Sequence, residues 1–347
     1  MSNMNDRRGW VAQRAMDNAW LSQTKEDIIE PSLEIVDPHH HLWARPGGVY
    51  ELDHLWDDTE SGHHVVQTLF IECRAQYHEE GPEHLRPLGE TAYVLPMIEA
   101  SRKETNKAQI MGMVGRVDLT HPLFDEALDA HVAMAGPLFK GIRQAPAFDQ
   151  QDMSALAIPG HGPENLLGND DYRAGVARLG ERGLTFDTWH YHTQNHAFRD
   201  FAEAIKGTRM ILDHFGTPLG VGRFTGKREE VFAQWKDDIA AIAEQPHVFA
   251  KLGGLAMIDN GWGFHERDKP IGSDEFAELM APWYLHTIDC FGPERCMFES
   301  NFPVDRPSVS YHVLYNAFKK LTQHMSKDDR ANLFSGTARH VYSIPKP

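Results

Sequence analysis

Short apolar runs alternate with longer amphipathic segments along most of the chain. The runs are rich in β-branched and large aliphatic residues, which favours buried strands. Between them, apolar residues recur every three or four positions, as in "REEVFAQWKDDIAAIAEQ" (228–245), which is typical of amphipathic helices. The predicted strands are Leu33–Val36, Val65–Ile71, Ile110–Val117, Leu138–Ile142, Leu184–Phe186, Met210–Leu212, Val248–Leu252 and Cys296–Phe298.

This alternation predicts an α/β fold in which the strands pair in parallel. Eight such units close most economically into a single (β/α)8 TIM barrel, here covering residues 33–347. An open doubly wound sheet is disfavoured because no GxGxxG follows the first strand. Residues 145–171 are rich in Gly, Pro and Asp and predict a long loop after the fourth strand. Residues 1–32 predict a helical extension that Pro31 ends.

The composition narrows the choice of partners. A net charge of −16 argues against nucleic acid, and no apolar run is long enough to span a membrane. Three cysteines without a CxxC pair indicate a reducing compartment, so we expect a cytoplasmic protein. We expect a small-molecule substrate with anionic character and a homo-oligomer, most simply a dimer.

Polar residues gather after the predicted strands, where barrel enzymes carry their chemistry. The first strand leads into "EIVDPHHHLW" (34–43), in which His39 and His41 share one face and His40 the other. A His-x-His pair at a strand end can clamp a metal or an anion, while His40 is expected to pack. The other strand-end residues are Glu72, Cys73, Arg74, Lys140, Arg143, His190, His192, Gln194, His196, Asp213, His214, Lys251, Glu299, Asn301 and Asp305.

Five motifs carry a family resemblance: "VDPHHHLW", "FKGIR", "LDHFG", "KLGGL" and "RCMFESNFPVD". In this order they resemble the amidohydrolase superfamily, from about residue 33 to residue 342. The most similar branch is the amidohydrolase-2 group of metal-dependent hydrolases, which includes sugar-lactone and pyrone-dicarboxylate lactonases. The resemblance implies a (β/α)8 barrel, in agreement with the alternation of the chain.

The resemblance also implies roles for individual residues. His39 and His41 match a metal-binding pair, His214 matches the histidine of the sixth strand, and Arg143 matches an anion clamp. The fifth-strand histidine is assigned to His192, with His190 as the other candidate. The implied cofactor is a divalent metal, zinc first and manganese or iron next. A metal-free mechanism stays open, in which the histidines and Arg143 form an oxyanion site.

The last strand departs from the family pattern G-S-D-W-P. The chain reads Glu299-Ser300-Asn301-Phe302-Pro303, so an amide replaces the aspartate that would bind metal and act as general base. An amide cannot accept a proton from water at neutral pH. Glu299, on the same strand face as residue 301, or Asp305 is expected to supply the carboxylate. The catalytic candidates are therefore His214, Asn301, Asp305 and Glu299.

The expected reaction is the hydrolysis of a lactone or related cyclic ester of a small acidic or sugar-like compound. A non-oxidative decarboxylase of a small aromatic or unsaturated acid is the alternative within enzymes. A barrel that lost its acid and only binds a ligand is the third hypothesis, motivated by Asn301. The candidates for substrate binding are Arg143, Lys140, Gln194, Trp43 and Glu72.

Overall fold

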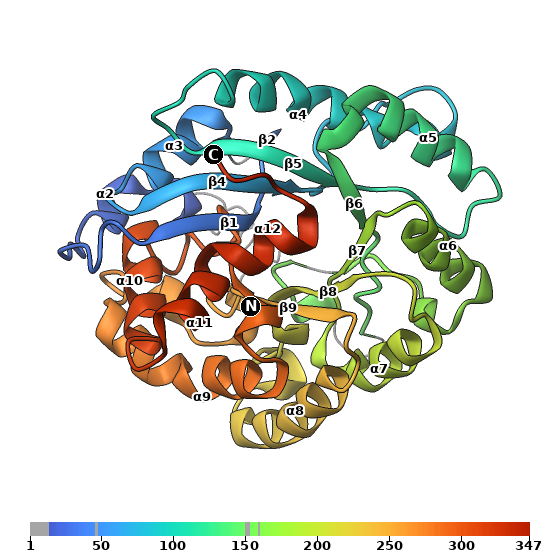
Figure 1. Cartoon of the computed structure of the whole chain (residues 1–347). Coiled ribbons are helices and arrows are strands. Elements are labelled where there is room, and N and C mark those ends of the chain that lie inside the picture. The colour runs from blue at the N-terminus through green and yellow to red at the C-terminus, as the bar shows by residue number, and fades with distance from the viewer. Residues whose placement is uncertain (1–13, 46–47, 150–152, 159) are drawn as a thin grey trace.

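The computed structural model describes residues 14–45, 48–149, 153–158 and 160–347. Eight parallel strands follow one another in chain order around a single sheet (Figure 1). The strands are β1 (Glu34–His40), β4 (His64–Ile71), β5 (Gln109–Gly115), β6 (Phe139–Arg143), β7 (Thr185–Thr188), β8 (Met210–Leu212), β9 (Val248–Leu252) and β10 (Cys296–Phe298).

The first and last strands meet just beyond their carboxyl ends. The backbone N–H of His41 donates to the carbonyl of Phe302 at 2.8 Å, and that of Asn301 donates to the carbonyl of His39 at 3.0 Å. These bonds nearly close the sheet, so the predicted (β/α)8 barrel is confirmed.

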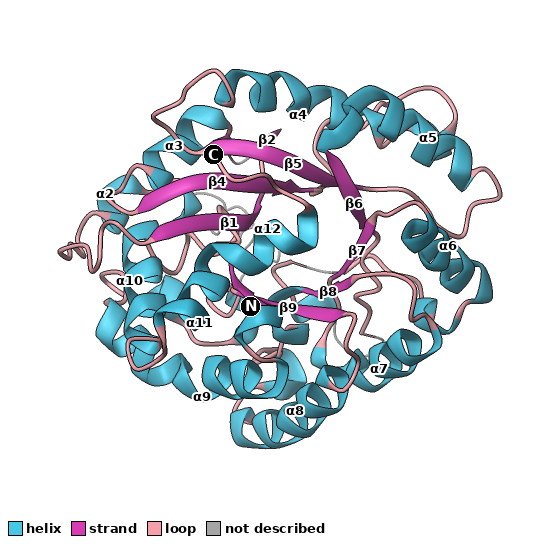
Figure 2. Cartoon of the chain, in the orientation of Figure 1, coloured by secondary structure: helices cyan, strands magenta, loops and turns pink. Residues whose placement is uncertain are grey.

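Helices surround the strands on the outside of the barrel (Figure 2). Among the described helices, none combines the length and the apolarity that crossing a bilayer requires. The helices are α3 (Leu52–Thr59), α4 (Leu88–Ser101), α5 (Phe124–Ala135), α6 (Asp170–Glu181), α7 (Asn195–Ala204), α8 (Arg228–Ala243), α9 (Ser273–Phe291), α10 (Tyr311–Leu321), α11 (Lys327–Ala331) and α12 (Thr337–Tyr342).

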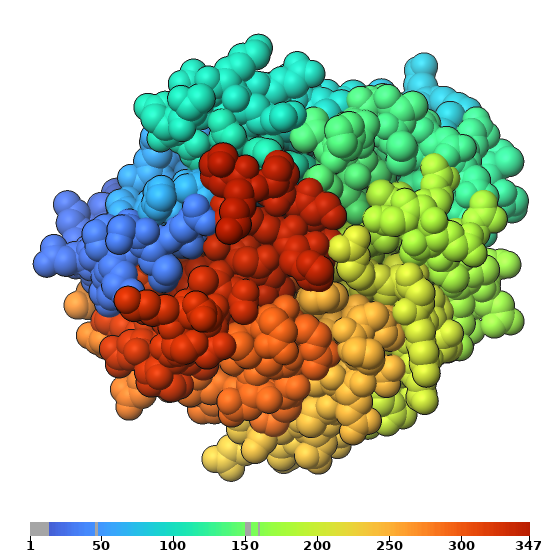
Figure 3. Space-filling view, viewed as in Figure 1, coloured from blue at the N-terminus to red at the C-terminus, as the bar shows by residue number. Residues whose placement is uncertain are grey.

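The amino end of the barrel is closed by α12. Val341, Tyr342 and Ile344 pack against Val36 and Met297 inside the barrel. The C-terminal segment fills the centre of this face in Figure 3. With this end blocked, a ligand has to enter at the opposite end, where the strands finish.

Two connections frame that opposite end. A hairpin that the hydrophobic pattern did not predict follows β1 and pairs β2 (Trp43–Arg45) with β3 (Gly48–Tyr50). The predicted long loop follows β6, and its described part contains only the short 3-10 turns Met153–Ala155 and Leu166–Gly168.

Gln194 holds the long loop in place. Its side-chain amide donates to the carbonyl of Pro146 at 2.8 Å, and its carbonyl accepts from the N–H of Phe148 at 3.1 Å. The structure therefore corrects the assignment of Gln194 to substrate binding, because its polar atoms are used by the loop.

The N-terminal extension is less helical than expected. Residues 1–13 lie outside the described residues, α2 (Asn18–Leu21) is short, and residues 22–33 contain no helix. Side-chain contacts hold the segment instead. Arg306 donates to the carbonyl of Ala15 and, at 2.6 Å, to the side chain of Asn18. Lys319 donates to the carbonyl of Ile29 at 2.8 Å.

Arg306 is expected to be the main anchor of the extension. Its guanidinium also pairs with the buried carboxylate of Asp58 at 2.9 Å. The Arg306→Ala variant leaves that carboxylate without a cation, so we expect a loss of about 3–5 kcal/mol in the free energy of unfolding. Arg330→Ala, which breaks the exposed pair with Glu30, is expected to cost less than about 1 kcal/mol. Urea unfolding measures both, and equal losses would contradict this assignment.

Candidate active site

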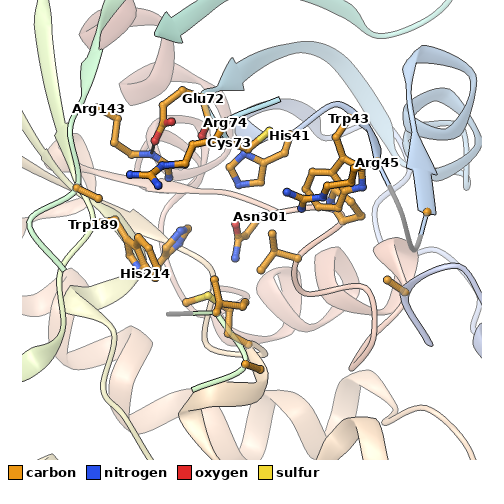
Figure 4. Close-up of a pocket in the computed structure, with 18 of the residues that line it drawn as sticks. His41, Trp43, Arg45, Glu72, Cys73, Arg74, Arg143, Trp189, His214 and Asn301 are labelled. Carbon is orange, nitrogen blue, oxygen red and sulfur yellow. Dashed lines mark hydrogen bonds and ion pairs between the residues drawn. The ribbon is translucent and has the colours of Figure 1, made fainter. Parts of the chain in front are cut away.

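A cavity of about 470 Å³ opens at the carboxyl ends of the strands. Its volume suits a small molecule. In Figure 4, side chains from separate strand ends converge on it. The wall includes His41 and Trp43 after β1, Glu72 after β4, Arg143 of β6, Trp189 after β7, His214 after β8 and Asn301 after β10.

Two histidines and one carboxylate form the centre of the site. Glu299 lies between His39 and His214, with one oxygen 2.6 Å from Nδ1 of His39 and the other 2.6 Å from Nδ1 of His214. All three side chains are buried, and their candidate ligand atoms lie within 4.8 Å of one another. Nitrogen and carboxylate donors at this spacing suit a divalent transition metal.

The protonation of this group follows from its burial. Burial, and then the positive charge of Lys251, lowers the pKa of His39 well below its ordinary value, so this imidazole is neutral. Burial likewise lowers the pKa of His214 to about 3. Burial raises the pKa of Glu299 to about 8. A proton or a cation is therefore required to stabilise the Glu299 carboxylate here.

His41 stands next to this centre, with its ring centroid 4.9 Å from that of His39. Its Nδ1 donates to the carbonyl of Ile71 at 2.8 Å, which fixes the tautomer. Nε2 is then the unprotonated nitrogen of a ring that lines the cavity. His40 points elsewhere and contacts the hydroxyl of Thr68 at 3.0 Å, as expected for a packed residue.

Arg143 connects the centre to the cavity wall. Its Nε donates to Glu72 at 3.0 Å, and one terminal nitrogen lies 3.3 Å from Nε2 of His39. Burial opposes the charged form, but the carboxylates of Glu72 and Asp213 raise the pKa of Arg143 above its ordinary value. A permanent positive charge therefore faces any bound substrate.

A charged network lies beneath these groups. From the sequence, two of its members, Asp213 and Lys251, were placed at strand ends without a role, and the third, Asp187, was not singled out. Lys251 is fully buried, and its ammonium group lies 2.7 Å from Asp187, 3.3 Å from Asp213 and 3.2 Å from Nδ1 of His39. Burial raises the pKa of Asp213 to about 6. The sequence did contain a sign of this network, because each of these charged residues lies within or directly after an otherwise apolar strand, where charges are rare.

Asn301 is a buried residue of the cavity wall. Its Nδ2 donates to Asp305 at 3.0 Å, so the amide orientation is defined. Its Oδ1 has no hydrogen-bond partner among the described residues. Its backbone is in the left-handed region with φ of 56°. This conformation costs a residue with a side chain about 1–2 kcal/mol and often occurs at functional sites.

The family of the chain follows from one comparison. A model of the family described as Amidohydrolase matches residues 36–344, which includes all eight strand-end positions. The chain belongs to the amidohydrolase family. The expected assignment to hydrolases of the amidohydrolase-2 type is thereby confirmed.

Several relatives of this amidohydrolase span almost its whole length. An L-fucono-1,5-lactonase from Burkholderia multivorans is 25% identical over 90% of this chain and 97% of its own. An uncharacterised protein from Sinorhizobium fredii is 28% identical over 90% of this chain and 99% of its own. A solved amidohydrolase from Burkholderia multivorans with bound zinc has a TM-score of 0.71 at 21% identity, covering 90% and 99% of the two chains. Lactonases thus occur among the relatives of this amidohydrolase.

Two expected site residues of the amidohydrolase lie elsewhere. The ring of His192 packs on Phe224, and its Nδ1 accepts from the N–H of Leu219 at 3.2 Å. The alternative, His190, contacts Thr188 and Asn195 through its two ring nitrogens. Because β7 ends at Thr188, both histidines lie beyond the strand, and the alternation of side chains along a strand does not tell which way either ring points.

Two further assignments are corrected by position. Lys140 donates to the carbonyl of Ser343 beside α12, at the closed end, because it is the second residue of β6 and so lies near the amino end of the strand, whereas Arg143 ends it. Asp305 is buried behind Asn301 and also accepts from the N–H of Ala256 at 3.2 Å. Asp305 orients the Asn301 amide and does not line the described cavity.

Proposed function

We propose that this amidohydrolase opens a lactone or related cyclic ester of a small acidic or sugar-like compound. The observation that carries the proposal is the convergence of three different groups on one cavity. They are the unprotonated nitrogen of His41, the free acceptor of Asn301 and the cationic side chain of Arg143. Ester hydrolysis needs a proton acceptor, an oriented water and a stabilised oxyanion, and these groups suit those needs.

The residues at the centre fit a divalent metal. Four carboxylates, those of Glu72, Asp187, Asp213 and Glu299, surround two cations, Arg143 and Lys251. A divalent cation held by His39, His214 and Glu299 would offset the remaining negative charge. This donor set favours zinc, with manganese or iron also accepted. Such an ion polarises a carbonyl and lowers the pKa of a bound water.

The protein's own groups would then divide the remaining work. Asn301 Oδ1 would accept a hydrogen bond from the attacking water and orient it toward the carbonyl carbon. His41 Nε2 would take the proton of that water, since its Nδ1 is committed to Ile71. As the ring C–O bond breaks, the same proton would pass from His41 to the leaving alkoxide oxygen, which gives the hydroxy acid. Arg143 would donate to the carbonyl oxygen as negative charge develops, and Glu72 holds its guanidinium in place. Trp43, which lines the cavity, would cover one side of the lactone ring of the substrate.

The test combines turnover with metal analysis. The purified protein, reconstituted with zinc, manganese or iron, is assayed against a panel of aldonic and aldaric lactones with a pH indicator. We expect hydrolysis of at least one lactone and about one metal ion bound per chain. In His39→Ala and His214→Ala, the rate of lactone hydrolysis and the affinity for the metal are each expected to fall by at least about 100-fold. Release of carbon dioxide from an aromatic acid, without hydrolysis of any lactone, would favour the decarboxylase instead.

A further inference from the structure

Two arginines on the cavity wall form no ion pair within the part of the chain that the structure describes. Arg74 and Arg116 both line the cavity. Among the described residues, neither guanidinium has a hydrogen bond or an ion pair, whereas Arg143 is paired with Glu72. The chain carries 50 acidic and 34 basic residues, so carboxylates are abundant. Arg45 also lines the cavity without an ion pair among the described residues, but its guanidinium stacks on the ring of Trp43 at 3.8 Å. Arg74 and Arg116 therefore stand out against the composition.

The fold places these two side chains together. Arg74 follows β4 and Arg116 follows β5, and the two strands are hydrogen-bonded neighbours whose ladder continues through the N–H of Glu72 and the carbonyl of Val114. Burial, and then the charge of Arg116, lowers the pKa of Arg74. The two guanidinium groups thus repel each other. In Figure 4, Arg74 lies on the same side of the cavity as Glu72 and Arg143.

The backbone at Arg74 supports a role other than packing. Its φ is 62°, in the left-handed region, where a residue with a Cβ is disfavoured by about 1–2 kcal/mol. Its side chain is exposed and lines the cavity, and among the described residues it forms no ion pair that would offset this cost. A strained residue whose side chain only faces a ligand cavity is more readily explained by binding than by stability.

We propose that Arg74 and Arg116 form a subsite for a carboxylate of the substrate. The inference rests on the proposed lactone hydrolysis and narrows its substrate class to lactones that carry a separate acid group. Guanidinium groups bind a carboxylate through paired N–H donors, and a bound anion relieves the repulsion between them. Because Arg143 serves the reacting carbonyl, the acid group is held apart from the ester that is opened.

Binding of unreactive diacids tests the subsite directly. Succinate, glutarate and adipate are titrated calorimetrically into the wild type and into Arg74→Gln/Arg116→Gln, beside their neutral diamides and inorganic phosphate. We expect at least one diacid to bind the wild type, with an affinity at least about tenfold lower in the variant. The diamides are expected to show no such difference. The proposal is overturned if none of the three diacids binds, or if a diacid binds the wild type and the variant equally. It is also overturned if phosphate binds the wild type more tightly than every diacid does.

A second variant separates binding from folding. Arg74→Gly removes the side chain and suits the left-handed backbone, so we expect a free energy of unfolding within about 1 kcal/mol of wild type. Its diacid affinity is expected to fall like that of the double variant. A large loss of stability would make Arg74 structural and overturn its role here. Since diacids contain no ester, this result stands or fails independently of lactone turnover.

Discussion

Glu299→Gln is expected to lower kcat/KM for the lactone substrate by about 100-fold to 1,000-fold. One oxygen of this carboxylate lies 2.6 Å from Nδ1 of His39 and the other lies 2.6 Å from Nδ1 of His214. Glutamine offers one acceptor and an NH₂ group, so one imidazole faces a donor and has to change tautomer or move. The bound metal is expected to fall with the activity. Steady-state kinetics and elemental analysis of the same preparations measure both effects.

Glu26→Gln provides the matched control for this substitution. Glu26 is a carboxylate that also accepts hydrogen bonds, here from the N–H and hydroxyl of Ser273, but it is only partly buried and lies in the extension. Its replacement is expected to leave kcat/KM within about threefold of wild type, because it contacts no group of the site. A Glu299→Gln protein with full metal content and wild-type kcat/KM would remove Glu299 from the site.

Lys251→Met is expected to lower the free energy of unfolding by about 3–5 kcal/mol. The ammonium group is fully buried and is the cation shared by Asp187 and Asp213. Methionine occupies a similar volume but leaves both carboxylates without this positive charge. Lys251→Met/Asp187→Asn is expected to recover part of the loss, since it removes one of the two charges. Urea unfolding at neutral pH gives all three values.

Lys140→Met serves as the control, because this lysine also belongs to a barrel strand. Lys140 is only half-buried, and its ammonium group makes one 3.4 Å contact to a backbone carbonyl. Its replacement is expected to cost less than about 1 kcal/mol. Similar losses in Lys251→Met and Lys140→Met would show that the buried network contributes no more than a surface contact.

The barrel, and part of the group of residues at the centre of the site, could be predicted from the sequence because both predictions depend on local periodicity. Apolar β-rich runs located all eight strands, and strand alternation placed His39 and His41 beside each other at the mouth. The pair His39 and His41 needed only the direction of side chains along a strand. The parity argument also selected Glu299, which does join the centre, although β10 ends at Phe298 and the positive φ of Asn301 shows that strand geometry does not extend to residue 301.

The remaining assignments failed where the strands end. His192 lies in a 3-10 turn after β7, and His214 has a φ of 54°, so neither side chain follows strand geometry. His214 was selected because it follows a predicted strand, and the family resemblance then gave it a role. The pairing of Lys251 with Asp187 and Asp213 joins three different strands, and the single sequence shows that these charges are buried without showing which ones meet.

The N-terminal extension bears on how far this enzyme resembles its relatives in substrate range. Ala15 and Met16 form part of the cavity wall, although the family match begins only at residue 36. A version shortened to the matched barrel would keep every proposed catalytic group and lose the part of the cavity wall that Ala15 and Met16 form. Exchanging this segment between homologues is therefore a route to new specificities that leaves the chemistry untouched.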